Sequence, residues 1–163
     1  MARLTHADRA GRARMVDVGR KRVTRRQAIA RGRVRFGRTA YRLLKENRLA
    51  KGDALAVGRL AGIQAGKRAS EWVPLCHPIP IEHLEVEIEL ADPRREAVVT
   101  AIARARWSTG VEMEALVAVA AACLALYDMT KAVERGVRVT DIELLEKTGG
   151  RSGAWRRPGR DRS

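Results

Sequence analysis

Residues 109–133 read TGVEMEALVAVAAACLALYDMTKAV, and this stretch decides the fold. Its middle, residues 115–126, is apolar at every position, which predicts a helix that is buried on most sides. Glutamates open the helix, and Asp128 and Lys131 close it. Because Asp128 and Lys131 have an i,i+3 spacing, both project from one face. The stretch therefore predicts a core helix that carries acid–base groups at its two ends.

These charges also have a purely structural interpretation. Thr109 and Glu112 match a capping box, in which each side chain bonds the backbone N–H of the other residue. Glu114 falls in the first helical turn, where the helix dipole favours negative charge. Asp128 and Lys131 could form a simple ion pair. The sequence of this helix alone leaves both interpretations open.

Strand patterns flank the helix on both sides. Residues 83–90 alternate apolar side chains with glutamates, which is typical of a strand with one wet face. A turn at Asp92-Pro93 and a second alternating run at residues 97–107 predict a hairpin. After the helix, Gly136 is a stop signal and residues 137–145 predict a last strand.

The N-terminal half predicts one more strand and two helices. Residues 23–36 indicate an edge strand with a bulge near Gly32. A short helix is expected at residues 40–48, capped by a threonine, and a second at residues 54–69, capped by Asp53. The order β-α-α-β-β-α-β predicts an α+β, ferredoxin-like split βαβ fold, an antiparallel sheet with helices packed on one face.

The chain divides into three expected parts. Residues 1–20 are polar and predict an N-terminal arm, and residues 21–148 predict a single ferredoxin-like catalytic domain. Residues 149–163 form a Gly/Arg-rich C-terminal tail. The backbone N–H groups of the glycine-rich loop at 148–153 could cradle a phosphate, although a loose tail explains the same composition.

Composition narrows the function classes. The 163 residues are 45% hydrophobic and carry a formal net charge of +14, which favours anionic ligands. Aromatic residues make up only 4%, so platforms for stacking nucleic-acid bases are scarce and no nucleic-acid partner is expected. No secretory signal or membrane-spanning run stands out, and the two cysteines build no disulfide framework. We therefore expect a cytoplasmic protein without a membrane partner.

The basic residues are unevenly chosen: 27 are Arg and six are Lys. A lysine that persists in such a chain indicates a place where Arg cannot substitute, because a lysine pKa can fall far enough to move protons. Drift at six positions explains the same count equally well.

A loop with three prolines, residues 73–80, presents Cys76 and His77. Adjacent Cys and His residues without CxxC or HExxH spacing are a weak metal signal, so no metal site is predicted. No P-loop and no GxGxxG motif occurs either. Acid–base groups and positive charge remain, which suits proton transfers around a phosphorylated small molecule without a redox cofactor.

Several motifs, in order along the chain, resemble the molybdenum cofactor biosynthesis protein C family, the cyclic pyranopterin monophosphate synthases. The longer motifs are Leu75-Cys-His-Pro78, Thr109-Gly-Val-Glu-Met-Glu-Ala-Leu116, Tyr127-Asp-Met129, Lys131-Ala-Val133, and Lys147 with Gly149-Gly150 and Ser152-Gly153. The shorter ones are Leu4-Thr-His6, Met15-Val-Asp-Val18, Lys51-Gly-Asp53 and Ala61-Gly-Ile63. The resemblance runs in register from about Leu4 to Gly153.

The resemblance implies a lyase reaction. The family converts cyclised dihydroguanosine triphosphate, made from GTP by a radical SAM partner, to the pterin cyclic pyranopterin monophosphate and releases pyrophosphate. By position, Asp128, Lys51 and Lys131 match its acid–base residues. Other positions match its substrate-binding segments or are weaker candidates for substrate contact: Leu75, Cys76, His77, Met113, Glu114, Glu112, Lys67 and Lys147.

The resemblance further implies a homohexamer, a trimer of dimers with sites at subunit interfaces. It implies no cofactor, although a divalent cation could accompany the triphosphate. One departure is Trp107-Ser108, where a small residue followed by a basic one is often found, so a cation from this position is in doubt. The alternative to the enzyme is a non-enzymatic RNA- or polyphosphate-binding ferredoxin-like module that uses the +14 charge.

Overall fold

A computed structural model describes residues 12–158. Its elements are, in chain order, β1 (Thr24–Arg35), α1 (Arg38–Lys45), α2 (Ala54–Gly66), α3 (Ala69–Trp72), β2 (His83–Ala91), the 3-10 turn η1 (Asp92–Arg94), β3 (Glu96–Trp107), α4 (Glu112–Thr130), β4 (Arg138–Thr148) and β5 (Trp155–Arg156). Residues 1–11 of the predicted arm, with the Leu4-Thr-His6 motif, and residues 159–163 of the predicted tail lie outside the described residues.

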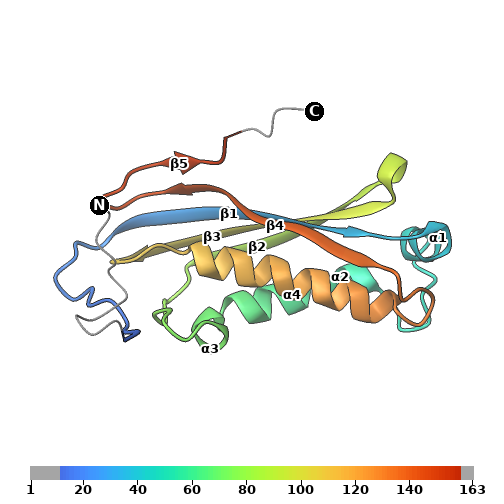
Figure 1. Cartoon of the computed structure of the whole chain (residues 1–163), viewed down its shortest axis with the longest axis horizontal. Helices are drawn as coiled ribbons and strands as arrows, with labels where there is room; N and C mark the ends of the chain where they lie inside the picture. The colour runs from blue at the N-terminus through green and yellow to red at the C-terminus, as the bar shows by residue number, and fades with distance from the viewer. Residues whose placement is uncertain (1–11, 159–163) are drawn as a thin grey trace.

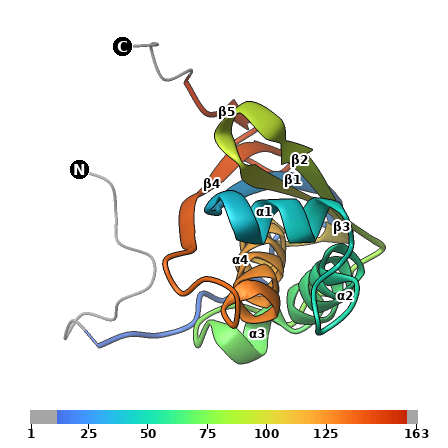
Figure 2. The same cartoon turned by 90° about the vertical axis from the view of Figure 1, so that its right-hand side faces the viewer.

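The five strands form one antiparallel sheet in the order β2-β3-β1-β4-β5, and the helices lie against one face of it (Figures 1 and 2). The order of the first four strands is that of the predicted ferredoxin-like arrangement, which is therefore confirmed. α2 and α4 lie side by side under the sheet, and α1 lies at one end of it (Figure 2).

The prediction that residues 23–36 form an edge strand is wrong, because β1 lies in the sheet between β3 and β4. Its alternating arginines do not face open water. Arg31 pairs with Glu143 at 2.8 Å, and Arg33 pairs with the fully buried Glu96 at 3.0 Å. The bulge does occur opposite Gly32, but the extra residue is in β4, where the register shifts between Arg31 and Arg33.

α4 is the core helix that the sequence predicts. Its residues from Ala115 to Cys123 are mostly buried, and Cys123 and Leu126 are fully so. By length and composition this helix could also cross a membrane, but 61% of it is buried inside the protein, as expected for the central helix of a packed core. Gly62 of α2 allows a close approach: a Cβ there would lie 2.8 Å from the Ala118 carbonyl oxygen of α4.

Only one predicted helix cap is confirmed. The Asp53 side chain accepts a hydrogen bond from Ala56 N at 2.9 Å and starts α2. α1 starts two residues earlier than expected, after Gly37, whose N–H donates to Glu134 Oε2. The Thr109 capping box is wrong: α4 begins after Val111 without a side-chain cap, and Glu112 faces β4 instead.

β5 is a strand that the sequence analysis did not predict. Within the expected tail, Trp155 pairs with Lys147 of β4 and Arg156 pairs with Glu146. The Arg156 side chain also bonds the Glu146 carboxylate at 2.8 Å, and Arg157 N donates to the Leu145 carbonyl. Part of the tail is therefore a fifth strand of the sheet.

Candidate active site

The carboxylate of Asp128 stands at the C-terminal end of α4 between two lysines. Its Oδ2 accepts a hydrogen bond from Lys51 Nζ at 2.7 Å, and its Oδ1 lies 2.6 Å from Lys131 Nζ. Lys51 also donates to the Asp128 backbone carbonyl at 2.9 Å. Lys51 reaches this point from the turn before α2, 77 residues away in sequence. We call these three residues the Asp128 cluster.

The two ammonium groups fix the charge state of this cluster. Hydrogen bonds from Lys131 and then Lys51 lower the pKa of Asp128 to about 2. The bond to Asp128 in turn raises the pKa of Lys131. A lysine pKa that can fall far enough to move protons was the hypothesis for the lysines that persist in this chain. For Lys131 the direction is opposite, because its nearest charged neighbour is a carboxylate. In this state Lys131 holds its proton near neutral pH.

Space for a ligand adjoins the Asp128 cluster. A cavity of about 410 Å³ is lined by Tyr127, Lys131, Ala132 and Arg135. All three side chains of the Asp128 cluster are between 42% and 53% exposed. A bound molecule in the cavity would therefore meet both an ammonium and a guanidinium group without any rearrangement of the core.

A second group of reactive side chains lies at the N-terminal end of α4. Lys147 Nζ of β4 bonds Glu112 Oε1 at 2.9 Å. Cys76, from the proline-rich loop, has its Sγ 3.9 Å from Glu114 Oε1. We call these four residues the Glu114 cluster. It unites one lysine, two carboxyl groups and one thiol that come from three separate segments of the chain.

Burial dominates the chemistry of the Glu114 cluster. The Glu114 side chain is 2% exposed, and its Oε2 is buried with no hydrogen-bond partner among the described residues. Burial, with a smaller contribution from the charge of Glu112, raises the pKa of Glu114 to about 7. Burial and then Glu114 raise the pKa of the Cys76 thiol to about 11. Cys76 is thus a neutral thiol, and Glu114 can exchange a proton near neutral pH.

The remaining predicted contacts surround the same end of α4. Leu75 and His77 are half-buried in the proline-rich loop. Met113 packs with a small apolar cluster that α2, α3 and α4 share. Lys67 is exposed at the C-cap of α2. The structure therefore brings Leu75, Cys76, His77, Met113, Glu112, Glu114, Lys67 and Lys147 to one end of the helix layer.

The two clusters are far apart within one chain. The helix between Glu114 and Asp128 spans about 21 Å, at 1.5 Å per residue. Glu112 reaches Lys147 of β4 and Glu114 is buried, whereas Asp128 is exposed at the other end of α4. Between the two ends, α4 has a partly exposed apolar stripe: Leu116 and Ala120 are half-buried and Leu124 is 53% exposed. The structure thus brings the predicted site residues together as two groups and not as one.

Sequence reasoning missed Arg26. Its guanidinium donates to the carbonyl oxygens of Trp107 and Ser108, at 3.2 and 3.1 Å. It thereby places a cation beside Ser108, the position where a basic residue was in doubt. It also lies against Gly150, where a Cβ would be 1.7 Å from Arg26 Nη1. Arg26 is one of 27 arginines in the sequence, and only the fold shows that it lies near the entry to α4.

Among residues 12–158, no group of three or more His, Cys, Asp or Glu side chains is arranged to hold a metal ion. The Cys76-His77 pair that could have suggested such a site places its thiol toward Glu114. The groups available in the described part of the chain are therefore proton donors, proton acceptors and fixed cations.

Comparison with known proteins gives consistent matches over this same region. The model of the MoaC family matches residues 15–150. A cyclic pyranopterin monophosphate synthase of Thermomicrobium roseum is 53% identical over 161 residues, which cover 96% of this chain and 95% of that protein. One of Cereibacter sphaeroides is 52% identical over 156 residues, 95% of this chain and 98% of that protein. The molybdenum cofactor biosynthesis protein 1 of Bos taurus is 53% identical over 154 residues, which are 94% of this chain but 24% of that longer protein.

Proposed function

The chain belongs to the MoaC family and is an enzyme of molybdenum cofactor biosynthesis, and we propose that it converts cyclised dihydroguanosine triphosphate to cyclic pyranopterin monophosphate and pyrophosphate. A radical SAM enzyme that acts on GTP would supply the substrate. The family membership favours this enzyme over a non-enzymatic RNA- or polyphosphate-binding module.

The observation that carries the proposal is the Asp128 cluster. Ring opening and ring closure need several proton transfers, and forming a cyclic monophosphate from a triphosphate expels pyrophosphate from the α-phosphorus. Lys51 and Lys131 would donate protons to the reacting atoms, and Asp128 would hold both ammonium groups in place at 2.7 and 2.6 Å. The cavity beside Lys131 offers the space for the reacting ring system.

The Glu114 cluster would complete the site. Glu114, with its pKa near 7, is suited to accept a proton and to pass it on to another group later in the reaction. Cys76 and His77 would contact the substrate, and Lys147 would keep Glu112 oriented through their 2.9 Å bond. The thiol is not needed as a nucleophile, because its raised pKa keeps it protonated.

We propose that a second copy of the chain unites the two clusters. If two α4 helices pack antiparallel about a two-fold axis, the Asp128 cluster of one copy meets the Glu114 cluster of the other. The exposed Leu124 and its half-buried neighbours Leu116 and Ala120 would form the apolar contact between the helices. Such a dimer has two equal composite sites, and a homohexamer would be a trimer of these dimers.

The reaction itself is tested by supplying the protein with authentic cyclised dihydroguanosine triphosphate and measuring pyrophosphate and the oxidised, fluorescent pterin. We expect both products in equal amounts without any added redox cofactor. An Asp128→Asn variant is the matched control, since it removes one charge from an exposed position and should fold normally. A wild-type protein that releases no pyrophosphate would refute the proposed function.

The same assay determines whether a divalent cation accompanies the triphosphate. We expect activity to survive dialysis against a chelator and to respond to added Mg²⁺ only through the substrate. A protein that loses its structure on chelation would instead contain a resident metal.

The composite site is tested by mixing two inactive variants, Asp128→Asn and Glu114→Gln, after brief dissociation. Half of the dimers are then mixed, and each mixed dimer has one intact site, so activity should return to about a quarter of wild type. Mixing Asp128→Asn with Lys131→Arg is the control and should restore nothing, because both changes lie in the same cluster. No recovery in the first mixture would refute the composite site.

A further inference from the structure

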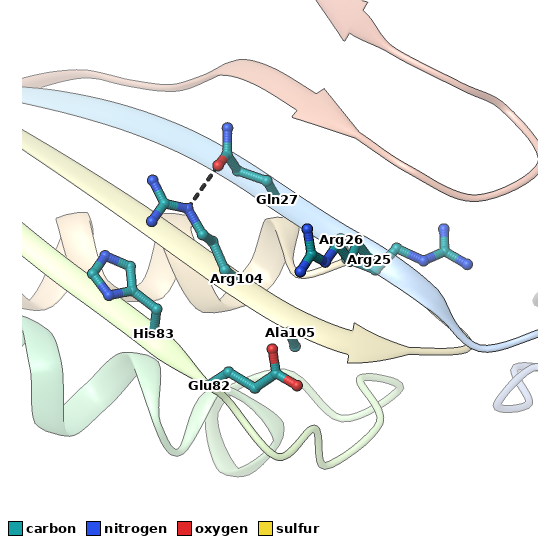
Figure 3. Close-up of a pocket in the computed structure, with 7 residues that line it drawn as sticks. All are labelled: Arg25, Arg26, Gln27, Glu82, His83, Arg104 and Ala105. Carbon is teal, nitrogen blue, oxygen red and sulfur yellow. Dashed lines mark hydrogen bonds between the residues drawn. The ribbon is translucent and has the colours of Figure 1, made fainter.

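The face of the sheet that the helices do not cover carries a regular arrangement of side chains. Successive residues of a strand point to opposite faces, and Gly32 of β1 points to the helices, since a Cβ there would lie 2.6 Å from Val119 of α4. Figure 3 shows the opposite face, with the helices behind the sheet. His83, Arg104 and Gln27 lie in register across β2, β3 and β1 at one end of it.

An acidic column runs along β2 on this face. It consists of Glu85, Glu87 and Glu89, which follow one another about 7 Å apart because alternate residues of a strand share a face. Glu85 lies 3.4 Å from His83. No hydrogen bond or ion pair within residues 12–158 reaches the carboxylates of Glu87 and Glu89, which are exposed. The acidic column therefore lacks most of its counter-charge within one chain.

A basic column, Arg31 and Arg33, runs along β1 on the same face. Arg31 is held by Glu143 at 2.8 Å, and Arg33 is held by the buried Glu96 at 3.0 Å. The two arginine side chains are 33% and 20% exposed, so their positions are fixed while part of each stays accessible. A guanidinium has five N–H donors, which is more than these bonds use.

Only β3 separates the two columns, and its central part is uncharged on this face. Thr100 has Glu87 as its neighbour on β2 and Arg31 as its neighbour on β1. Val98, the next outward residue of β3, has a glutamate and an arginine in the same places. Val98, Thr100 and Ile102 are all half-buried, so they form a partly apolar strip between the charges.

This face is complementary to itself in one orientation. Two sheets can stack about 10 Å apart around a two-fold axis that runs parallel to β3. β2 of each copy then lies over β1 of the other, so Glu87 faces Arg31 and Glu89 faces Arg33. A two-fold axis across the strands would instead place β2 over β2, with glutamates against glutamates, which is unfavourable.

We propose that a second copy of this chain docks on this face in the first orientation, with β3 over β3 and the acidic column of each copy against the basic column of the other. We call this the sheet contact. It leaves α4 free, because α4 lies on the opposite side of the sheet (Figures 1 and 2). Two different two-fold contacts on opposite sides of a chain can alternate and close a ring of six. That ring rests on the composite site proposed above, whereas the sheet contact does not.

The arginines at one end of the face do not prevent this packing. Arg104 lies about 14 Å along β3 from Thr100, and stacked sheets cross at about 30°, so the ends of the two β3 strands diverge. A cavity of about 410 Å³ lies at this end, and Arg104 is held beside it by Gln27 at 2.7 Å. The Arg104 side chains of the two copies therefore stay apart and hydrated.

The test compares the mass of the full chain with that of the double variant Glu87→Lys/Glu89→Lys by sedimentation velocity, at one protein concentration and ionic strength. Each new lysine would face an arginine of the second copy, so the sheet contact should weaken on the order of a hundredfold or more. The hexamer should then dissociate to dimers, a third of the wild-type mass. Both positions are exposed, so the variant should fold, which circular dichroism checks.

Glu46→Lys/Glu71→Lys is the matched control, because it adds the same charge at exposed positions after α1 and in α3. It should keep the wild-type mass. A Glu87→Lys/Glu89→Lys variant with the wild-type mass, or a control that dissociates equally, would overturn the sheet contact. If the α4 contact is absent, the same comparison is between a wild-type dimer and a variant monomer.

Crosslinking tests the orientation. Thr100→Cys places two thiols opposite each other across the axis, so a short bifunctional thiol reagent should join the copies. Glu87→Cys thiols would be displaced sideways by two strand spacings, about 10 Å, and should not be joined. The wild type, with Cys76 and Cys123, gives the background. Crosslinking at Glu87→Cys but not at Thr100→Cys would overturn the proposed orientation.

Turnover separates the sheet contact from the proposed function. If Glu87→Lys/Glu89→Lys keeps the wild-type mass while authentic substrate is converted, the sheet contact is wrong and the reaction stands. If the variant dissociates as expected but the wild type releases no pyrophosphate, the sheet contact stands and the reaction is wrong.

Discussion

The two ends of α4 carry carboxyl groups in opposite environments. At the C-terminal end, Asp128 is 53% exposed and two lysines lower its pKa to about 2. At the N-terminal end, Glu114 is 2% exposed and burial raises its pKa to about 7. One carboxylate is therefore a fixed charge, and the other changes its protonation near neutral pH.

Under the proposed reaction, this difference would give the two ends of one apolar helix different parts in the proton transfers. Lys131 stays protonated beside the ionised Asp128, whereas Glu114, a buried carboxyl group with a pKa near 7, can accept a proton. The separation along α4 keeps the two groups from neutralising each other within one chain. A substitution that gives Asp128 and Glu114 the same charge state should therefore lower activity more than it impairs folding.

The largest effect is expected from replacing a lysine of the Asp128 cluster by arginine. Lys51→Arg and Lys131→Arg keep the charge that holds Asp128 but remove a group able to transfer a proton, because a guanidinium pKa exceeds about 12. Turnover should fall on the order of a hundredfold to ten-thousandfold in single-turnover kinetics, with substrate affinity changed much less.

Lys45→Arg is the matched control for these variants, since Lys45 bonds Asp92 at the same 2.7 Å on α1. Near wild-type turnover in both Lys51→Arg and Lys131→Arg would show that the two lysines supply only positive charge. The proposed difference in proton transfer between the two ends of α4 would then be wrong.

The next effect is on the pH dependence of the free energy of unfolding, and it comes from the buried Glu114 alone. The pKa of Glu114 rises from about 4.5 unfolded to about 7 folded, so the unfolded state loses its proton first as pH rises. The wild type should lose stability on the order of 3 kcal/mol between pH 4.5 and pH 7, at 1.36 kcal/mol per pKa unit.

Glu114→Gln should remove that part of the pH dependence, as urea unfolding at several pH values would measure. Glu89→Gln, an exposed position of β2, is the control and should follow the wild type. An equal pH dependence in all three proteins would mean that Glu114 is already ionised in the fold.

A smaller effect should act on both ends at once. Gly62→Ala places a methyl group 2.8 Å from the Ala118 carbonyl oxygen and 3.1 Å from Val86, so α2 must move away from α4. α2 begins three residues after Lys51, and its last residue, Gly66, lies against the Glu114 backbone, so both clusters should shift together. The free energy of unfolding should fall by about 1–3 kcal/mol.

Gly136→Ala is the comparison for this variant, because the added Cβ would meet only the end of the flexible Glu134 side chain, at 3.8 Å. Thermal melting that ranks Gly136→Ala below Gly62→Ala in stability would contradict the close packing of α2 against α4.

The smallest effect is expected at Cys76. Its thiol stays protonated because burial and Glu114 raise its pKa to about 11. Cys76→Ser should therefore change turnover by less than about tenfold, well below the loss of a general acid or base. Iodoacetamide at pH 7.5 should label the native thiol slowly and the unfolded thiol rapidly, and fast native labelling would indicate a thiolate at this end.

Local patterns in the sequence were sufficient for most of the fold. The apolar run of α4, the alternation of β2 and β3 and the Asp53 cap of α2 each depend on neighbours a few residues apart. The central place of β1 could not be predicted, because the partners of its arginines are 61 to 112 residues away. The local sequence does not show that Glu96 and Glu143 pair with these arginines, and arginines in a strand are otherwise typical of an exposed edge.

The candidate site divides in the same way. The motifs around Cys76, Glu114 and Asp128 pointed to the reactive side chains, but their spacing along the chain did not show which of them meet. The pairing of Lys51 with Asp128 and of Lys147 with Glu112 depends on the tertiary fold. The charge states follow from burial and ion pairing, and it is the Asp128 carboxylate beside Lys131 that raises the pKa of this lysine.

β5 protects the sheet from other chains. It gives β4 a second neighbour at Glu146 and Lys147, and Arg157 adds a bond to the Leu145 carbonyl. A chain shortened after Gly153 would leave those backbone groups unpaired, and free strand edges act as templates for aggregation. The arginines at this end keep the added strand charged, so it discourages further pairing. The C-terminal strand thus leaves less of the β4 edge open to pairing with another chain.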